Sequence, residues 1–114
     1  MLLIQKISTD SYQTQTVRLD DGTSFVLTLY YVPMQYGWFI TELVYQDFVV
    51  RNIRVTNIPN ILYQWKNKIP FGLFCVTDGG REPTQLEDFA TGVARLYVLT
   101  AAEVEEYTEY LENG

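Results

Sequence analysis

QTQTVRLDDGTSFVLTLYY, residues 13–31, is the stretch of the sequence that decides the fold. A period of two runs through both of its halves, so alternate side chains share a face: Gln13, Gln15, Val17 and Leu19 in the first half, and Phe25, Leu27, Leu29 and Tyr31 in the second. Between the halves stands Asp21-Gly22, a pair typical of tight turns because glycine takes positive φ without steric cost. The stretch therefore predicts a β-hairpin.

The same period continues beyond the hairpin. A turn region between Pro33 and Gly37 leads into a strand over 38–45, and Gln46-Asp47 separates that strand from another over 48–56. These strands follow one another through short turns, so we expect a four-strand antiparallel meander. Further strands are expected over 2–7, 71–77 and 93–99, which gives about seven strands at the spacing typical of small sandwiches and barrels.

Three other segments break this pattern. Between Pro59 and Pro70, the spacing of Ile61, Leu62 and Trp65 fits one helical turn under the sheet. The run 71–77 is apolar without alternation, which predicts a central strand covered on both faces. Residues 78–91 combine Gly79-Gly80 with several carboxylates, and they are expected to form a solvated surface loop.

The chain closes with a helical pattern. Thr100 and Glu103 have the spacing of a capping box, and Val104, Tyr107 and Leu111 then line one face. The expected fold class is mainly β: a small antiparallel β-sandwich or barrel of about seven strands with a short C-terminal helix. At 114 residues, with 47% hydrophobic and 19% charged residues, the chain is expected to be a single β-rich domain spanning 1–114.

Several kinds of chemistry are disfavoured by what the sequence lacks. It contains no histidine, which removes the usual general base, the usual activator of a nucleophile and the commonest zinc ligand. Cys75 lies in the apolar run, where burial makes a thiol unreactive. We therefore expect no enzyme activity, no cofactor and no metal; a third hypothesis, a carboxylate-dependent hydrolase, would use Glu87 or Asp88.

The net charge of the chain and its N-terminal sequence indicate which partners and which cellular location to expect. The net charge is −6, and residues 58–114 hold nine acidic against four basic groups, which disfavours a phosphate backbone as a partner. The apolar run Met-Leu-Leu-Ile at 1–4 is too short for a signal peptide, and no stretch is long enough to span a bilayer. We expect no specific nucleic acid, no membrane insertion and no disulfide, which suits folding in a reducing cytoplasm.

Aromatic residues make up 15% of the chain, and this high content is the compositional feature that says most about function. Neighbouring aromatic residues on a strand point to opposite faces, so one set is expected to fill the core and another to meet a partner. The interface candidates are Tyr30, Tyr36, Trp38 and Tyr45. Stacking on a sugar is the competing use of such residues, and it makes a carbohydrate-binding β module the alternative function.

An ordered set of motifs carries a family resemblance. It comprises the 12–19 strand, Asp21-Gly22, the Phe25-x-Leu27-x-Leu29 strand, Gly37-Trp38-Phe39, the segment 71–78 and the segment 95–103. Over roughly residues 2–104 the chain resembles the baseplate plug proteins of contractile-tailed phages, known from cyanophages. Two positions differ from the expected pattern: the turn at Gln46-Asp47 has no glycine, and Asn52 stands where a glycine would be natural, although asparagine tolerates left-handed backbone.

The resemblance implies a structural tail protein, without catalytic residues to carry over. It would be a component of the virion tail baseplate that acts as a plug or hub-proximal part at the distal end of the tail tube. Its partners would be other baseplate and tail tube or hub proteins. Assembly would take place in the host cytoplasm, and the chain is expected to be a homo-oligomer within the virion.

Overall fold

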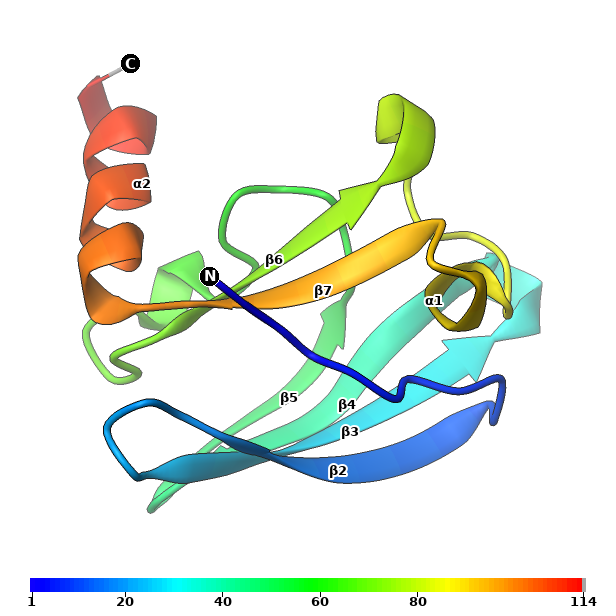
Figure 1. The fold of residues 1–114 in the computed structure, drawn as a ribbon, viewed down its shortest axis with the longest axis horizontal. Helices are drawn as coiled ribbons and strands as arrows, with labels where there is room; N and C mark the ends of the chain where they lie inside the picture. Colours follow the sequence, from blue (N-terminus) through cyan, green and yellow to red (C-terminus); the bar gives the residue numbers. More distant parts are fainter. Residues whose placement is uncertain (114) are drawn as a thin grey trace.

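Two antiparallel sheets face each other in a computed structural model that describes residues 1–113, with the side chains of residues 1–109 (Figure 1). The large sheet has the order β2 (Tyr12–Arg18), β3 (Ser24–Val32), β4 (Gly37–Tyr45) and β5 (Phe48–Arg54). The small sheet has the order β1 (Leu2–Leu3), β7 (Ala94–Leu99) and β6 (Gly72–Thr77). The sheets do not close on each other, so the fold is the sandwich and not the barrel.

The predicted hairpin is confirmed. β2 and β3 pair along their length with Gln15 opposite Leu27, and Gly22 in the turn has φ of 91°. The Leu19 N–H donates to the Thr23 carbonyl at 2.8 Å, and the Asp21 side chain accepts a hydrogen bond from the Thr23 N–H at 2.9 Å. The four-strand meander follows as expected, because short turns join each strand to its neighbour.

The small sheet differs from its prediction at two strands. The first strand is only Leu2–Leu3, and the chain then crosses between the sheets with Ile4 and Ile7 buried. β6 is an edge strand, so the prediction of a central strand is wrong; β7 is central. Residues 60–62 cover the free edge of β6 instead, because the Ile61 N–H donates to the Leu73 carbonyl at 2.8 Å.

Two aromatic triads pack the large sheet against the segments that face it. At one end Phe71 stacks on Phe25 with centroids 4.5 Å apart and meets Tyr45 edge to face at 5.2 Å. At the other end Trp38 meets Tyr31 at 5.4 Å and Phe89 at 5.8 Å. The side chains of Trp38 and Tyr45 are 0% and 7% exposed. This corrects the expectation that these two residues form an interface, because they stand on the inner face of β4.

The 78–91 segment is less solvated than predicted. It contains a short 3-10 turn, η3 (Asp78–Gly80), and a single helical turn, α1 (Asp88–Thr91), whose Asp88 and Phe89 are buried. Its backbone accepts hydrogen bonds from the core aromatics: Tyr31 Oη donates to the Thr84 carbonyl at 2.6 Å, and Trp38 Nε1 to the Gln85 carbonyl at 3.3 Å. The segment is thereby fastened over the second triad.

The helical predictions hold. A 3-10 turn, η2 (Tyr63–Trp65), follows the buried Ile61 and Leu62. Helix α2 (Ala101–Asn113) begins after a reciprocal capping box, in which the Thr100 N–H donates to Glu103 Oε1 at 3.0 Å and the Glu103 N–H to Thr100 Oγ1 at 3.2 Å. Val104 is buried and Tyr107 packs on Phe74. The Leu111 side chain lies outside the described residues.

Backbone angles explain the two positions at which a glycine was expected. Gln46 has φ of 53° and Asn52 has φ of 60°, so both stand in the left-handed region. Glycine adopts this region without cost and asparagine at a modest one. At the β4–β5 turn and within β5, the chain therefore adopts the left-handed backbone that favours glycine, with glutamine and asparagine at the two positions.

Replacing Trp38 with alanine is expected to destabilise the domain by about 3–5 kcal/mol, because the substitution empties the centre of one triad. Tyr36→Ala is the matched control: this ring is 67% exposed, so the cost should stay within about 0.5 kcal/mol. Urea unfolding followed by fluorescence and circular dichroism measures both. Equal costs for the two variants would contradict the burial of Trp38.

Candidate functional site

The outward-facing side chains of the large sheet form rows that cross all four strands. The first, here called the aromatic row, consists of Tyr12, Tyr30, Phe39 and Arg54, which stand opposite one another from β2 to β5. Tyr12 and Tyr30 meet edge to face with centroids 5.9 Å apart, and the Arg54 guanidinium carbon lies 5.4 Å from the Phe39 centroid. Because Tyr12 is 61% and Tyr30 40% exposed, the aromatic row is a surface feature.

Two further rows run parallel to the aromatic row, the polar row next to it and the aliphatic row beyond. A polar row consists of Thr14, Thr28, Glu42 and Arg51, and an aliphatic row of Thr16, Val26, Val44 and Val49. The hydroxyls of Thr14 and Thr28 lie 3.0 Å apart, and Arg51 Nε donates to Glu42 at 3.3 Å. The charges of the polar row therefore pair with each other, and the face presents aromatic and aliphatic surface on either side of a neutral strip.

Arg54 ties the aromatic row to the turn before β4, which contains the 3-10 turn η1 (Pro33–Gln35). Arg54 Nη2 donates to the carbonyls of Gln35 and Tyr36 at 3.1 Å each. The guanidinium crosses directly over Gly37, where a Cβ would stand 2.5 Å from Nη2. The turn is thus held beside the row, and its exposed Met34 and Tyr36 extend the apolar surface.

Of the interface candidates, Tyr30 lies in the aromatic row and Tyr36 in the adjoining turn, and an interface there remains a prediction. Trp38 and Tyr45 lie in the core. Sequence reasoning misses Tyr12 and Phe39, which the structure brings into line with Tyr30. The period of two already carried part of this signal, because Tyr12 faces away from Val17 and Phe39 away from Trp38.

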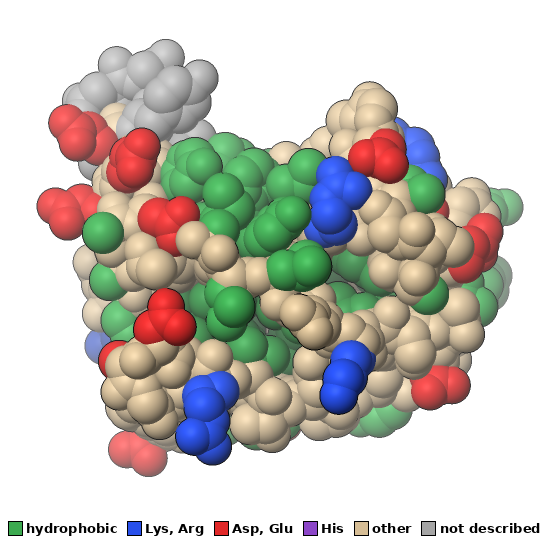
Figure 2. Space-filling view, in the orientation of Figure 1, with side chains coloured by type: hydrophobic (Ala, Val, Ile, Leu, Met, Phe, Trp, Pro, Cys, Tyr) green, Lys and Arg blue, Asp and Glu red, His purple; other side chains and the backbone are tan. Residues whose placement is uncertain are grey.

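The outer face of the small sheet is also apolar. Its outward positions are only partly covered, and the apolar ones are Leu3, Phe74, Val76 and Tyr97. Helix α2 packs on one end of this face, where the rings of Tyr107 and Phe74 lie 5.8 Å apart. Figure 2 shows hydrophobic side chains gathered over β6 and β7, in a hollow between α2 and the segment after β6. The apolar run 71–77 thus places side chains on both the inner and the outer face of the small sheet, but α2 covers only part of the outer face.

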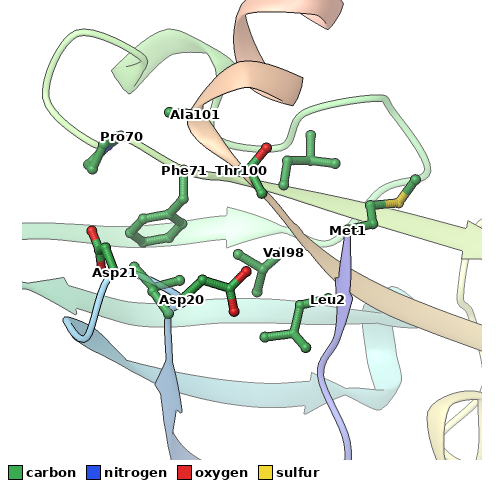
Figure 3. A pocket seen from close by; sticks show the side chains of 11 residues that line it. Met1, Leu2, Asp20, Asp21, Pro70, Phe71, Val98, Thr100 and Ala101 are labelled. Carbon is green, nitrogen blue, oxygen red and sulfur yellow. The ribbon is translucent and has the colours of Figure 1, made fainter.

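A cleft of about 290 Å³ opens at the end of the sandwich, next to the Phe71 triad (Figure 3). Four segments wall it: Met1-Leu2, the β2–β3 turn, Pro70-Phe71 and the junction of β7 with α2. Its floor is apolar, with Phe71, Val98 and Leu99 buried. Two carboxylates, those of Asp20 and Asp21, stand at its mouth.

The structure brings together no reactive constellation in the part of the chain that it describes. No cluster of three or more potential metal ligands occurs among these residues, and neither α1 nor α2 is long and apolar enough to cross a membrane. The Cys75 side chain is 0% exposed, and burial raises the pKa of its thiol to about 12, with smaller contributions from Glu82 and Asp88. This thiol is therefore protonated and shielded.

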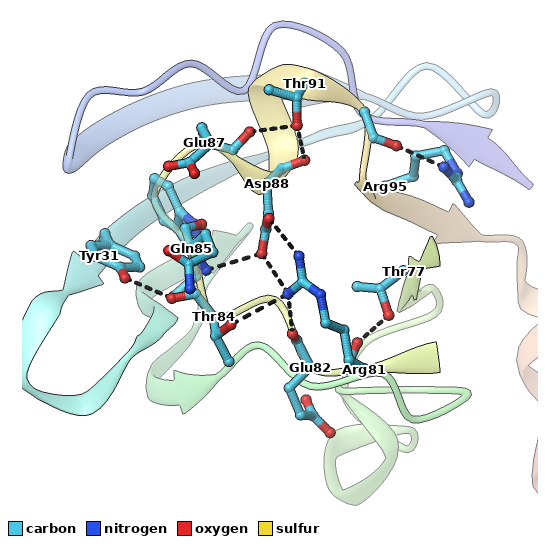
Figure 4. A network of polar contacts seen from close by, with 12 residues as sticks. Tyr31, Thr77, Arg81, Glu82, Thr84, Gln85, Glu87, Asp88, Thr91 and Arg95 are labelled. Atoms are coloured by element: carbon cyan, nitrogen blue, oxygen red, sulfur yellow. Dashed lines mark hydrogen bonds and ion pairs between the residues drawn. The ribbon is translucent and has the colours of Figure 1, made fainter. Parts of the chain in front are cut away.

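The buried carboxylate of the 78–91 segment, that of Asp88, is used structurally (Figure 4). Arg81 holds Asp88 in a two-pronged ion pair, Nη1 to Oδ2 and Nη2 to Oδ1, both at 2.9 Å, and the Gln85 N–H donates to Oδ2 at 3.0 Å. Burial alone would raise the pKa of Asp88, but the hydrogen bonds from Arg81 and Gln85 outweigh it, so the pKa is lowered. Asp88 is an anchor for the segment, and Glu87 beside it is exposed.

A β-sandwich with a buried thiol, a buried ion pair that anchors its own loop and apolar residues on the outer faces of both sheets has the features of an architectural protein. The family model for the cyanophage baseplate Pam3 plug gp18 matches residues 1–101, and the chain belongs to this family. It is a structural protein of the phage tail baseplate. The match ends at the first residue of α2. Among the curated proteins, no match is found.

Acid should weaken the domain through Asp88. A carboxylate with a lowered folded pKa stabilises above its unfolded pKa of about 4, and this contribution is lost as the pH falls through the folded value. Asp88→Asn should therefore cost about 1–3 kcal/mol at neutral pH and reduce the loss of stability below about pH 4. Unfolding curves across this range measure both effects; Glu87→Gln, on an exposed neighbour, should cost less than about 0.5 kcal/mol at neutral pH.

Cys75 is expected to resist thiol reagents at neutral pH while the domain is folded, because the thiol is both buried and protonated. Addition of denaturant should release one equivalent of reactive thiol. A colorimetric thiol assay with and without denaturant measures this difference. Rapid labelling of the folded chain would contradict the burial of Cys75.

Proposed function

We propose that the chain is a plug at the distal end of the tail tube, held there by neighbouring baseplate and tail tube or hub proteins that pack on the outer faces of its sandwich. The observation that carries this proposal is that the outer faces carry rows of partly exposed aromatic and aliphatic side chains in addition to the core between the sheets. Such side chains add little to folding while they stay in water, and they stabilise a complex when a partner covers them.

The aromatic row supports a protein partner in particular. Tyrosine and arginine are enriched at interfaces because they combine a large contact area with polar groups that can still be hydrogen-bonded. Here Tyr12, Tyr30 and Arg54 lie in one line across the sheet, and Arg54 is fixed by two backbone carbonyls. A rigid row loses little side-chain entropy on binding, which favours its use as the centre of a contact.

We propose further that the role is purely structural. The chain of 114 residues has no histidine, Cys75 is buried, and Asp88 is engaged by Arg81. Copies of the chain would contact one another within the virion, since β2 and β5 are the edges of the large sheet and an edge strand can pair with another chain. The single free thiol is compatible with assembly in the host cytoplasm.

The alternative, a carbohydrate-binding module, now depends on the exposed tyrosines. Tyr12, Tyr30 and Tyr36 are accessible to a sugar ring, whereas Trp38 is buried and cannot stack on one. A glycan array distinguishes the two functions. Saturable binding that is lost in Tyr30→Ser would favour the sugar platform.

The double variant Tyr12→Ser/Tyr30→Ser tests the aromatic row. Incorporation into virions should fall about tenfold or more, because two tyrosines at the centre of an interface contribute roughly 1–2 kcal/mol each. Ile58→Ser is the matched control, since Ile58 is 46% exposed but lies outside both sheets. Mass spectrometry of purified particles, with a wild-type and a variant copy supplied in trans, measures the ratio.

Cryo-electron microscopy of the same particles locates the chain. Density for the sandwich at the distal end of the tail tube is the expected result, and its outer faces should be covered by neighbouring chains. Absence of the chain from the baseplate, or full incorporation of the double variant, would count against the proposal.

A further inference from the structure

The cleft at the end of the sandwich has an unusual combination of floor and rim. The floor is formed by side chains that also belong to the core, Phe71, Val98 and Leu99. The rim on the β2–β3 side carries Asp20 and Asp21, whose carboxylates are drawn close to the floor in Figure 3. A volume of about 290 Å³ is suited to one long side chain rather than to a folded segment.

The two carboxylates are not equivalent. Asp21 accepts hydrogen bonds from the Thr23 N–H at 2.9 Å and the Thr23 hydroxyl at 2.6 Å, which belong to the turn itself. Asp20 makes no hydrogen bond or ion pair with any residue that the structure describes, and its carboxylate extends into the cleft towards Val98 (Figure 3). Asp20 is therefore a negative charge beside an apolar floor, available to a ligand.

The one cationic group among the residues that line the cleft is already used. Met1 lines the cleft, but its ammonium group pairs with Glu103 Oε1 at 2.9 Å. That pair is neutral, so the charge at the mouth of the cleft remains that of Asp20 and Asp21. An anionic ligand would be repelled by this rim, and a purely apolar one would leave the Asp20 carboxylate without a partner.

We propose that the cleft binds an arginine or lysine side chain of a neighbouring baseplate protein, with the aliphatic stem on Phe71 and the charged group at Asp20. The assignment rests on the proposed packing of the chain within the baseplate. Long basic side chains bury their stems on apolar surface and keep the charged end at a polar rim, as this cleft requires. At this acidic cleft a different protein is favoured over a second copy, because a second copy with its net charge of −6 would be repelled by the rim, whereas contacts between copies would use the edge strands.

The test uses two acetylated, amidated tripeptides, Leu-Arg-Leu and the same peptide with citrulline, the neutral isostere of arginine. Amide NMR spectra of the full chain are recorded during titration with each. The arginine peptide should give saturable shifts at Asp20, Phe71 and Thr100, and the citrulline peptide should bind about fivefold more weakly, as expected for one partly exposed ion pair.

Variants separate this site from general attraction to an acidic surface. Asp20→Asn should weaken the arginine peptide about fivefold and bring it level with the citrulline peptide. Glu87→Gln removes one charge at the far end of the molecule and should change the affinity by less than about twofold. Equal binding of the two peptides to the wild-type chain, or an equal loss in both variants, would overturn the proposal.

Two further outcomes are distinguishable. Self-association of the chain that disappears in Asp20→Asn would overturn the assignment to a different protein and identify a second copy as the occupant. Absence of the chain from baseplate density would defeat the proposed function and with it the identity of the partner. The peptide titration would still report whether the cleft binds a basic side chain.

Discussion

Phe71 is the contact through which the two sheets are locked together. It lies just before β6, yet its ring stacks on Phe25 of β3 at 4.5 Å and meets Tyr45 of β4 at 5.2 Å. The second triad, around Trp38, joins the large sheet to α1 at the other end. Because the core lies between the sheets, the exposed apolar residues on the outer faces are available for contacts with other molecules.

Much of this fold follows from local pattern. The hairpin and the capping box each depend on residues that lie close together in the sequence, and both form as predicted. The orientation of Trp38 is harder to predict, because it and Phe39 are both aromatic and a shift in register between Thr28 and Leu29 decides which faces inward. The aromatic row needs the register of four strands at once, and the order of the small sheet, with β6 at an edge that Ile61 covers, depends on pairings between distant segments.

The outer faces and the end cleft offer two different kinds of contact. Broad apolar faces supply affinity but tolerate sliding, since apolar contact has little directionality. A single charged side chain seated at Asp20 would add little affinity but would fix one orientation. The same division exists inside the domain, where the aromatic triads provide burial and the Arg81–Asp88 pair fixes one segment in place.

The net charge of −6 has a consequence for the partly exposed apolar outer faces of the two sheets. Before a subunit meets its neighbours, its valines and tyrosines are uncovered, and such surfaces invite indiscriminate clustering. Mutual repulsion between like-charged subunits opposes that clustering. A neighbouring protein rich in cations would cancel this repulsion when the subunit docks on it. The acidic surface would therefore set an order of assembly, in which the subunit binds a basic neighbour before it binds other copies of the same chain.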